Sequence, residues 1–142
     1  MFKLIFTLLA LVFGAFAVSA QEKLPEYGNI ADLTGMNKIY VSADSTNSRK
    51  FILDELKKYP ALQLVTSPDE AEFILECKQT GHIIVPEILG RENPTFEMVA
   101  YTLKDGRRRV AWSETKTSLR PATSLLTRDF VKALKKIRGE KK

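Results

Sequence analysis

Residues 96–116 read FEMVAYTLKDGRRRVAWSETK, two runs of alternating apolar and polar residues that meet at Asp105-Gly106. An Asp-Gly pair between such runs is a strong signal for a β-hairpin. Because side chains alternate across a strand, the hairpin has two distinct faces. We expect one face to lie in the core and the other to be a mixed surface. The predicted core face carries Val99, Tyr101, Leu103, Val110 and Trp112, and the predicted surface carries Met98, Ala100, Thr102, Arg107, Arg109, Ala111 and Ser113.

Three further strands are predicted before this hairpin. KIYVSA at 38–43 and LQLV at 62–65 alternate as short strands, and AEFILECKQ at 71–79 predicts a third. In the third strand Phe73, Leu75 and Cys77 share one face, which we expect to be buried.

Two helices and one helical turn complete the pattern. Residues 44–59 begin with capping residues, continue with apolar residues at helical spacing and stop before Pro60. Ser67-Pro68-Asp69-Glu70 predicts one capped turn. SLLTRDFVKALKKI at 124–137 predicts a final helix. Its apolar stripe holds Leu126, Phe130, Ala133, Leu134 and Ile137.

The predicted order β-α-β-β-β-β-α indicates an α+β fold, a five-stranded mixed sheet with both helices packed on one face. The helix between the first two strands predicts a crossover that leaves them parallel, with the other strands largely antiparallel. Residues 81–95, GHIIVPEILGRENPT, hold two glycines and two prolines. We expect this stretch to be a long connection.

The chain start, MFKLIFTLLALVFGAFAVSA, has the layout of a cleavable secretory signal, and we expect cleavage after Ala20. Its apolar run of 15 residues is shorter than the ~20 that a membrane-spanning helix needs, so an uncleaved anchor is the less favoured alternative. After a signal at 1–20, we expect an irregular lead-in at 21–36, a single α/β domain at 37–138 and a basic tail at 139–142. The predicted location is the periplasm or the extracellular space.

KIYV followed by a helix, the AEFILE strand, and YTLKDGRRRVAWSE before a closing helix together resemble a small periplasmic α/β domain. That domain is found at the N-terminus of TolB and, with variations, in curli-assembly and penicillin-binding-protein-activator lipoproteins. The resemblance covers about residues 36–138 and consists of fold-level hydrophobic patterns. It implies a non-enzymatic domain that docks other envelope proteins. We expect no lipid anchor, because no cysteine lies near the predicted cleavage point, and no second domain.

The chain has one histidine, His82, and one cysteine, Cys77. A Cys-His pair could serve a small secreted enzyme or redox protein, and this is the alternative function. Since Cys77 is in phase with Phe73 and Leu75, we expect it to be an inert core residue. No spacing of carboxylates completes a zinc site, and no phosphate loop or nucleophile elbow is present. We therefore expect no enzyme activity, metal or cofactor.

Positive charge is concentrated at the end of the chain. Residues 128–142 hold seven basic and two acidic residues, whereas residues 21–127 carry a net charge of −1. We predict one anion-attracting surface that combines the hairpin tip with the polar face of the last helix. Its residues are Arg107, Arg109, Lys132, Lys135 and Lys136, beside Arg128. The alternative is that the arginines only form a solvated hairpin tip.

The segment 82–89 is too apolar for an ordinary loop. It could complete the core over a sheet edge, form an exposed patch that meets a partner, or touch a membrane. Its candidate binding residues are Ile83, Ile84, Ile88 and Leu89. Together these patterns predict an exported domain that binds an envelope protein or an anionic envelope surface. We expect no nucleic-acid partner, because the signal directs the protein out of the cytoplasm, and we keep an oligomer paired through a strand edge as a third possibility.

Overall fold

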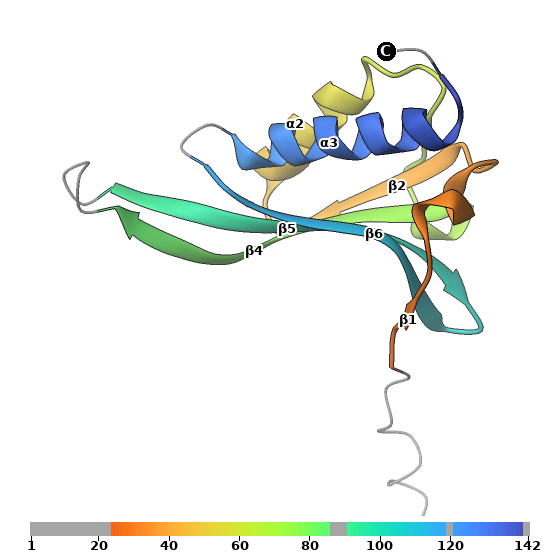
Figure 1. Cartoon of the computed structure of the whole chain (residues 1–142), viewed down its shortest axis with the longest axis horizontal. Helices are drawn as coiled ribbons and strands as arrows, with labels where there is room; N and C mark the ends of the chain where they lie inside the picture. The colour runs from red at the N-terminus through yellow and green to blue at the C-terminus, as the bar shows by residue number, and fades with distance from the viewer. Residues whose placement is uncertain (1–23, 86–90, 119–120, 141–142) are drawn as a thin grey trace, which may run out of the picture.

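The computed structural model describes residues 24–85, 91–118 and 121–140. Within these ranges a mixed sheet carries both helices on one face, while the other face has no helix (Figure 1). The predicted α+β class and the predicted order of elements are confirmed, and a sixth strand, β1, is added to the expected five. In chain order the elements are β1 (Glu26–Tyr27), η1 (Ile30–Leu33), β2 (Lys38–Ala43), α2 (Thr46–Leu56), β3 (Gln63–Leu64), η2 (Pro68–Glu70), β4 (Phe73–Val85), β5 (Arg91–Lys104), β6 (Arg107–Thr117) and α3 (Ala122–Ile137).

The strands are ordered β1-β6-β5-β4-β2-β3 across the sheet. As predicted, β2 and β3 are parallel and joined by the helix α2. β4 is also parallel to β2, and β1 is parallel to β6, while β4, β5 and β6 are antiparallel neighbours. Both outermost strands, β1 and β3, are only two residues long.

Local sequence signals account for the starts of α2 and η2. The Ser45 hydroxyl accepts a hydrogen bond of 3.1 Å from the backbone N–H of Ser48 and so caps α2. The Ser67 hydroxyl accepts one of 3.3 Å from the N–H of Asp69, with Pro68 at the first helical position. The predicted helix and the predicted capped turn are therefore both present.

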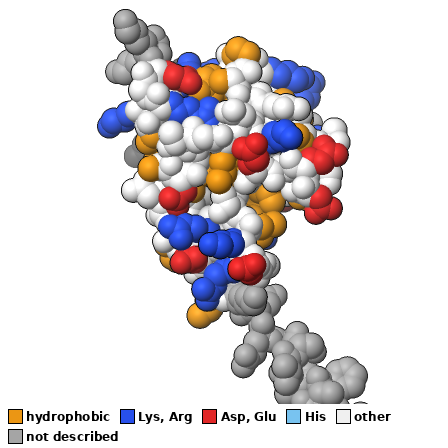
Figure 2. Space-filling model, turned by 90° about the vertical axis from the view of Figure 1, so that its right-hand side faces the viewer, with side chains coloured by type: hydrophobic (Ala, Val, Ile, Leu, Met, Phe, Trp, Pro, Cys, Tyr) orange, Lys and Arg blue, Asp and Glu red, His pale blue; other side chains and the backbone are white. Residues whose placement is uncertain are grey.

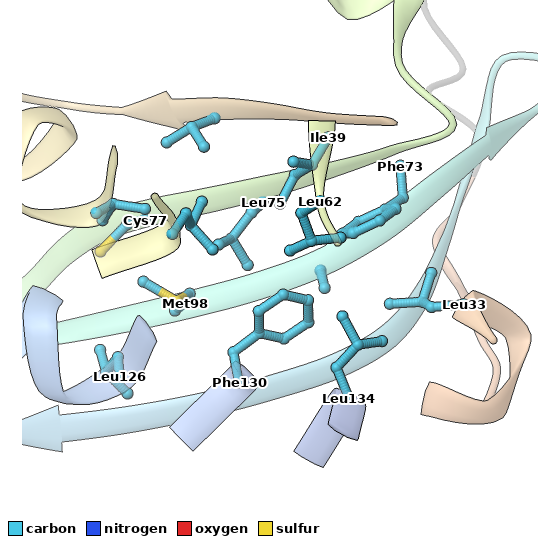
Figure 3. Close-up of a cluster of buried hydrophobic side chains, with 14 of the residues drawn as sticks. Leu33, Ile39, Leu62, Phe73, Leu75, Cys77, Met98, Leu126, Phe130 and Leu134 are labelled. Atoms are coloured by element: carbon cyan, nitrogen blue, oxygen red, sulfur yellow. The ribbon is translucent and has the colours of Figure 1, made fainter. Parts of the chain in front are cut away.

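The core lies between the helices and the sheet (Figure 3). At its centre Phe130 of α3 points toward the sheet, with its ring centroid 6.0 Å from that of Phe73 and 5.2 Å from that of Trp112. Cys77 lies in the same core and is buried, as its strand phase predicted. Other fully buried side chains are Leu33, Ile39, Ile52, Leu75, Met98, Leu126 and Leu134.

The predicted hairpin faces were wrong. Met98 and Ala100 are fully buried under the helices, and Leu103 is 56% exposed. Pairing with β4 decides this, since Cys77 lies opposite Met98 and Leu75 opposite Ala100. The buried face of β4 thus continues into these two residues of β5.

A register shift in β6 explains why Trp112 still reaches the core. Tyr101 pairs with Val110, but Ala100 pairs with Trp112, so Ala111 is an extra residue in β6. Such a bulge reverses the side on which the following residues project. Val110 therefore shares the helix-free face with Tyr101, and Trp112 packs on the helix face.

The predicted long connection at 81–95 was also wrong. β4 continues to Val85 and β5 begins at Arg91, so residues 81–85 and 91–95 extend the β4–β5 pair into a projecting arm (Figure 1). Residues 86–90 lie outside the described residues. A register shift between Gln79 and Gly81 leaves Thr80 as an extra residue in β4. Pro94 is compatible with the strand because the arm is two-stranded at that point, where it pairs with His82.

The lead-in, expected to be irregular, carries two ordered elements in its described part. Besides β1, it forms the short helix η1, which opens with a capping box between Asn29 and Asp32. Leu33 of η1 is fully buried in the core. The segment therefore belongs to the packed fold.

Phe130→Ala should lower the free energy of unfolding by about 3–5 kcal/mol, because it empties a buried site between two aromatic rings. Phe51→Ala on α2 is the matched control, since the Phe51 side chain is 43% exposed. We expect the Phe51→Ala control to lower the free energy of unfolding by less than about 1 kcal/mol. Urea unfolding followed by fluorescence measures both, and equal losses would contradict the assigned core.

Candidate functional site

The predicted binding residues occupy three separate parts of the structure. Arg107 and Arg109 lie on β6 near the hairpin tip, and three lysines lie near the end of α3. Ile83 and Ile84 are paired within the β4–β5 arm, opposite Asn93 and Glu92. Ile88 and Leu89 are outside the described residues.

The arginines of the hairpin tip hold the N-terminal segment on the sheet. Arg109 Nε donates to Asp32 Oδ2 at 3.0 Å, and its NH1 lies 3.6 Å from Glu26 Oε1. Arg107 Nε donates to the carbonyl of Leu24 at 3.0 Å. Strand pairing explains the contact with Glu26, because Glu26 lies directly opposite Arg109 in the β1–β6 register. The charge of Arg109 is therefore already matched by two carboxylates.

The electrostatics of this contact agree with its geometry. The pKa of Asp32 is lowered, first by the hydrogen bond from the backbone N–H of Asn29 and then by the one from Arg109. Gly28 passes close to the same pair, and a Cβ on it would lie 2.7 Å from Arg109 Nε. A side chain at this position would therefore displace Asp32 and Arg109 from their contact.

Arg108, which the sequence did not single out, covers the helix-free face. Its NH1 lies 2.9 Å from Glu76 Oε2, and its guanidinium lies 4.5 Å from the centroid of the Tyr101 ring. Tyr101 is thereby almost fully buried although no helix covers it. The alternation of the strand was the available signal, because it places Arg108 on the face opposite Arg109.

The lysines of α3 have a different environment. Lys132, Lys135 and Lys136 line one open groove, which we call the lysine groove, together with Ala133, Gly139 and Glu140. Among the described residues, no carboxylate forms an ion pair with Lys132 or Lys136. Lys135 Nζ lies 5.1 Å from the centroid of the Tyr59 ring. The groove therefore presents the charges of Lys132 and Lys136, which no carboxylate of the described residues matches.

The end of α3 shapes this groove. Gly139 has φ of +67° and ends the helix in the left-handed conformation that glycine favours. The next residue, Glu140, accepts a hydrogen bond of 2.7 Å from the Tyr59 hydroxyl. The pKa of Tyr59 is raised, by burial first and by this carboxylate second. The carboxylate of the groove is thus bound to a neutral hydroxyl.

Arg128, expected on the same basic face, is engaged elsewhere. Its Nε and NH2 donate to the two carboxylate oxygens of Glu55 on α2 at 3.2 and 3.1 Å. This bidentate contact lowers the pKa of Glu55 and links the two helices. The free basic surface is consequently smaller than the sequence predicted.

The structure does not bring the tip arginines and the lysine groove together. η1 contacts both α3 and β6, and in Figure 1 it lies between the C-terminal end of α3 and the hairpin tip. At the lower end of the molecule in Figure 2, basic and acidic side chains are intermixed. Arg108 and Arg109 both form ion pairs with carboxylates. The lysine groove is therefore the separate candidate site.

The alternative Cys-His site has unfavourable geometry. Burial, and secondly the charge of Asp44, raises the pKa of Cys77 to about 12. His82 follows five positions later on the same strand, which at ~3.3 Å per residue places the two backbones ~16 Å apart. The described residues also contain no cluster of three or more potential metal ligands and no helix long and apolar enough to cross a membrane.

Arg109→Gln should loosen the N-terminal segment while leaving the melting temperature nearly unchanged, because the contacts that it removes are exposed. Hydrogen exchange at the amides of Gly28 and Asn29 should accelerate. Lys104→Gln, at the same hairpin tip, is the control. The pKa of Asp32 is lower in the folded protein than in the unfolded chain. Ionised Asp32 therefore stabilises the folded state fully at pH values above its unfolded-state pKa, and this stabilisation is lost as the pH falls through its folded-state pKa. The difference in amide exchange rate between wild type and Arg109→Gln should disappear in that acidic range. Equal exchange rates at neutral pH would contradict the role of Arg109 in holding the N-terminal segment.

No protein-family model and no curated protein matches this chain. Solved structures are similar to it at low sequence identity. A variant of the PelC dodecamer from Paraburkholderia phytofirmans is 12% identical over 80% of this chain and 95% of that chain, with a TM-score of 0.47. A DUF4136 family protein from Bacteroides thetaiotaomicron is 10% identical over 79% and 94%, with a TM-score of 0.47.

The lipoprotein GNA1162 from Neisseria meningitidis is 11% identical over 70% of this chain and 99% of that chain, with a TM-score of 0.37. At these identities the likeness is one of overall fold only. The finer resemblance to the TolB N-terminal domain stays a prediction.

Proposed function

We propose that this chain is an exported, non-enzymatic domain that binds a phosphate-bearing anionic surface of the cell envelope through the lysine groove. The observation that carries the proposal is the contrast between two basic groups. The tip arginines are engaged by carboxylates and a carbonyl, whereas Lys132 and Lys136 are exposed and have no ion pair among the described residues. Charge left unmatched on one face is available to a partner.

The composition of the groove suits a polyanionic surface. Lysine ammonium groups act as mobile point charges, which can adapt to phosphates at irregular spacing. Three lysines around one groove raise the local concentration of anions, and the effect falls as salt screens exposed charges over ~8 Å at physiological ionic strength. The expected secretory signal at 1–20 would deliver the domain to such a surface, although those residues are outside the described part.

The state of Cys77 supports a non-enzymatic role. A thiol that is buried and has its pKa raised to about 12 is protonated at neutral pH and is a poor nucleophile. The chain has no other cysteine that could act in its place. Binding therefore accounts for the exposed features better than a thiol-dependent reaction does.

In the native protein, Cys77 should react with a thiol reagent only when the protein unfolds, because the thiol is buried and protonated. We expect the reaction to be at least about 100-fold slower in buffer than in denaturant, as even a modest stability of ~5 kcal/mol keeps the unfolded fraction far below one per cent. Absorbance after addition of a chromogenic disulfide measures the rate. A native rate close to that of the denatured chain would contradict burial and favour the alternative enzyme or redox role.

Replacing Lys132, Lys135 and Lys136 together by Gln should weaken binding to vesicles that contain phosphatidylglycerol, by about tenfold or more at low salt, because each lysine near an anionic membrane contributes ~1 kcal/mol. The melting temperature should change little, since Lys132 and Lys136 are solvated and the contact of Lys135 with the Tyr59 ring contributes at most ~1 kcal/mol. Vesicle co-sedimentation at several salt concentrations measures the binding.

The charge-matched control replaces Lys38, Lys50 and Lys104 by Gln, because these exposed lysines do not line the groove. We expect the control to retain most of the binding of the wild type. Neutral vesicles should bind neither variant nor wild type. Absence of binding to anionic vesicles at low salt, or equal losses in the two triple variants, would contradict the proposed function.

A further inference from the structure

The outer edge of β6 is open along most of its length. β1 pairs with β6 only at Arg109 and Val110, and the N–H of Gly28 adds one bond to the carbonyl of Val110. Beyond that point β6 continues to Thr117, and in the described part of the chain no strand pairs with its outer side. Figure 1 shows that β1 meets β6 only near the hairpin tip. Residues 112–117 therefore present backbone groups that another strand can bind.

This edge has few of the features that usually block strand addition. It contains no proline, and Ser113, Thr115 and Thr117 are exposed on the helix-free face. The free edge of β4 differs, because Asp44 Oδ2 accepts a hydrogen bond of 2.8 Å from the N–H of Gln79, just past the last residue that pairs with β2. The β6 edge is thus the better candidate for adding a strand.

We propose that a second copy of this chain occupies the β6 edge, with the two β6 strands antiparallel and centred on Thr115. In two antiparallel strands related by a twofold axis, each residue lies opposite a residue of the partner strand, and the two side chains point to the same face of the sheet. With Thr115 on the axis, Glu114 of each copy lies opposite Lys116 of the other. Ser113 lies opposite Thr117 on the other face.

Charge complementarity selects this register. Centring the pair on Glu114 would place two glutamates opposite one another, and centring it on Lys116 would place two lysines opposite one another. Like charges directly opposite across strands are destabilising, whereas opposite charges are favourable. Only the register centred on Thr115 pairs Glu114 with a lysine, and β1 prevents a longer slide by covering the edge at Val110.

The existing contacts leave Glu114 available. Lys116 Nζ already lies 2.6 Å from Asp129 Oδ2 of α3, which fixes its position on the helix face. Glu114 has no ion-pair partner among the described residues of its own chain. The second copy would supply Lys116 as this partner, and the twofold axis repeats the same pair on its other side. Both helix layers would then lie on the same face of one continuous sheet, because the twofold axis is perpendicular to that sheet.

Cysteine crosslinking tests the register directly. In the proposed pair the two Thr115 Cβ atoms lie ~4.5–5.5 Å apart, close enough for a disulfide after small adjustment. The two Thr117 positions lie about four residues apart along the strands, or ~13 Å. Under mild oxidation Thr115→Cys should give a covalent dimer, whereas Thr117→Cys on the same strand and face should stay largely monomeric. Cys77 does not compete, because it is buried.

Sedimentation velocity over a concentration series tests the association without a crosslink. Thr115→Lys would place two lysines on the twofold axis and should weaken the dimer by about tenfold or more. In the monomer the same lysine would face Glu97, its cross-strand neighbour, so the fold should tolerate it. Thr66→Lys, in an exposed loop position, is the matched control and should leave the association unchanged.

Three results would overturn the proposal. They are a monomer at all concentrations in the sedimentation series, equal crosslinking of the two cysteine variants, and a dimer that Thr115→Lys leaves unchanged. The inference does not depend on the lysine groove, which lies on α3, so the triple lysine variant should dimerise like the wild type.

Discussion

The packing of Phe130 between Phe73 and Trp112 is the contact on which the rest of this structure depends. It joins α3 to β4 and β6 and so fixes which face of the sheet is buried. Trp112 can take part only because the extra residue Ala111 turns it toward the helices. With that face closed, the lysines of α3 must point away from the core and the side chain of Arg108 must lie on the helix-free face.

The three consecutive arginines make different contacts, because neighbouring side chains of a strand point to opposite faces of the sheet. Arg107 and Arg109 hold the N-terminal segment, and Arg108 covers Tyr101 from the opposite face. A motif that suggests an anion-binding cluster in the sequence is thus largely used within the fold. Lysines without an ion pair among the described residues gather around one groove on α3, which is why we assign the binding role to the lysine groove.

The two proposed surfaces are compatible with each other. The lysine groove lies near the C-terminal end of α3, whereas residues 112–117 of β6 form an open edge of the sheet. A dimer formed through β6 would keep both helix layers on one face and would present two lysine grooves in the same direction. Two weak electrostatic sites on one assembly bind a surface more tightly than either site alone.

The sequence by itself determined the α+β class, the order of the elements, the Asp105-Gly106 turn and the burial of Cys77, because periodicity and turn chemistry are local properties. It did not determine which face of the hairpin is buried, that 81–85 and 91–95 would extend two strands, or that Arg109 would meet Asp32, 77 positions away in the chain. These features depend on the pairing of β4, β5 and β6 and on a one-residue bulge. A shift of one residue reverses every side chain of a strand, so only the assembled sheet could decide them.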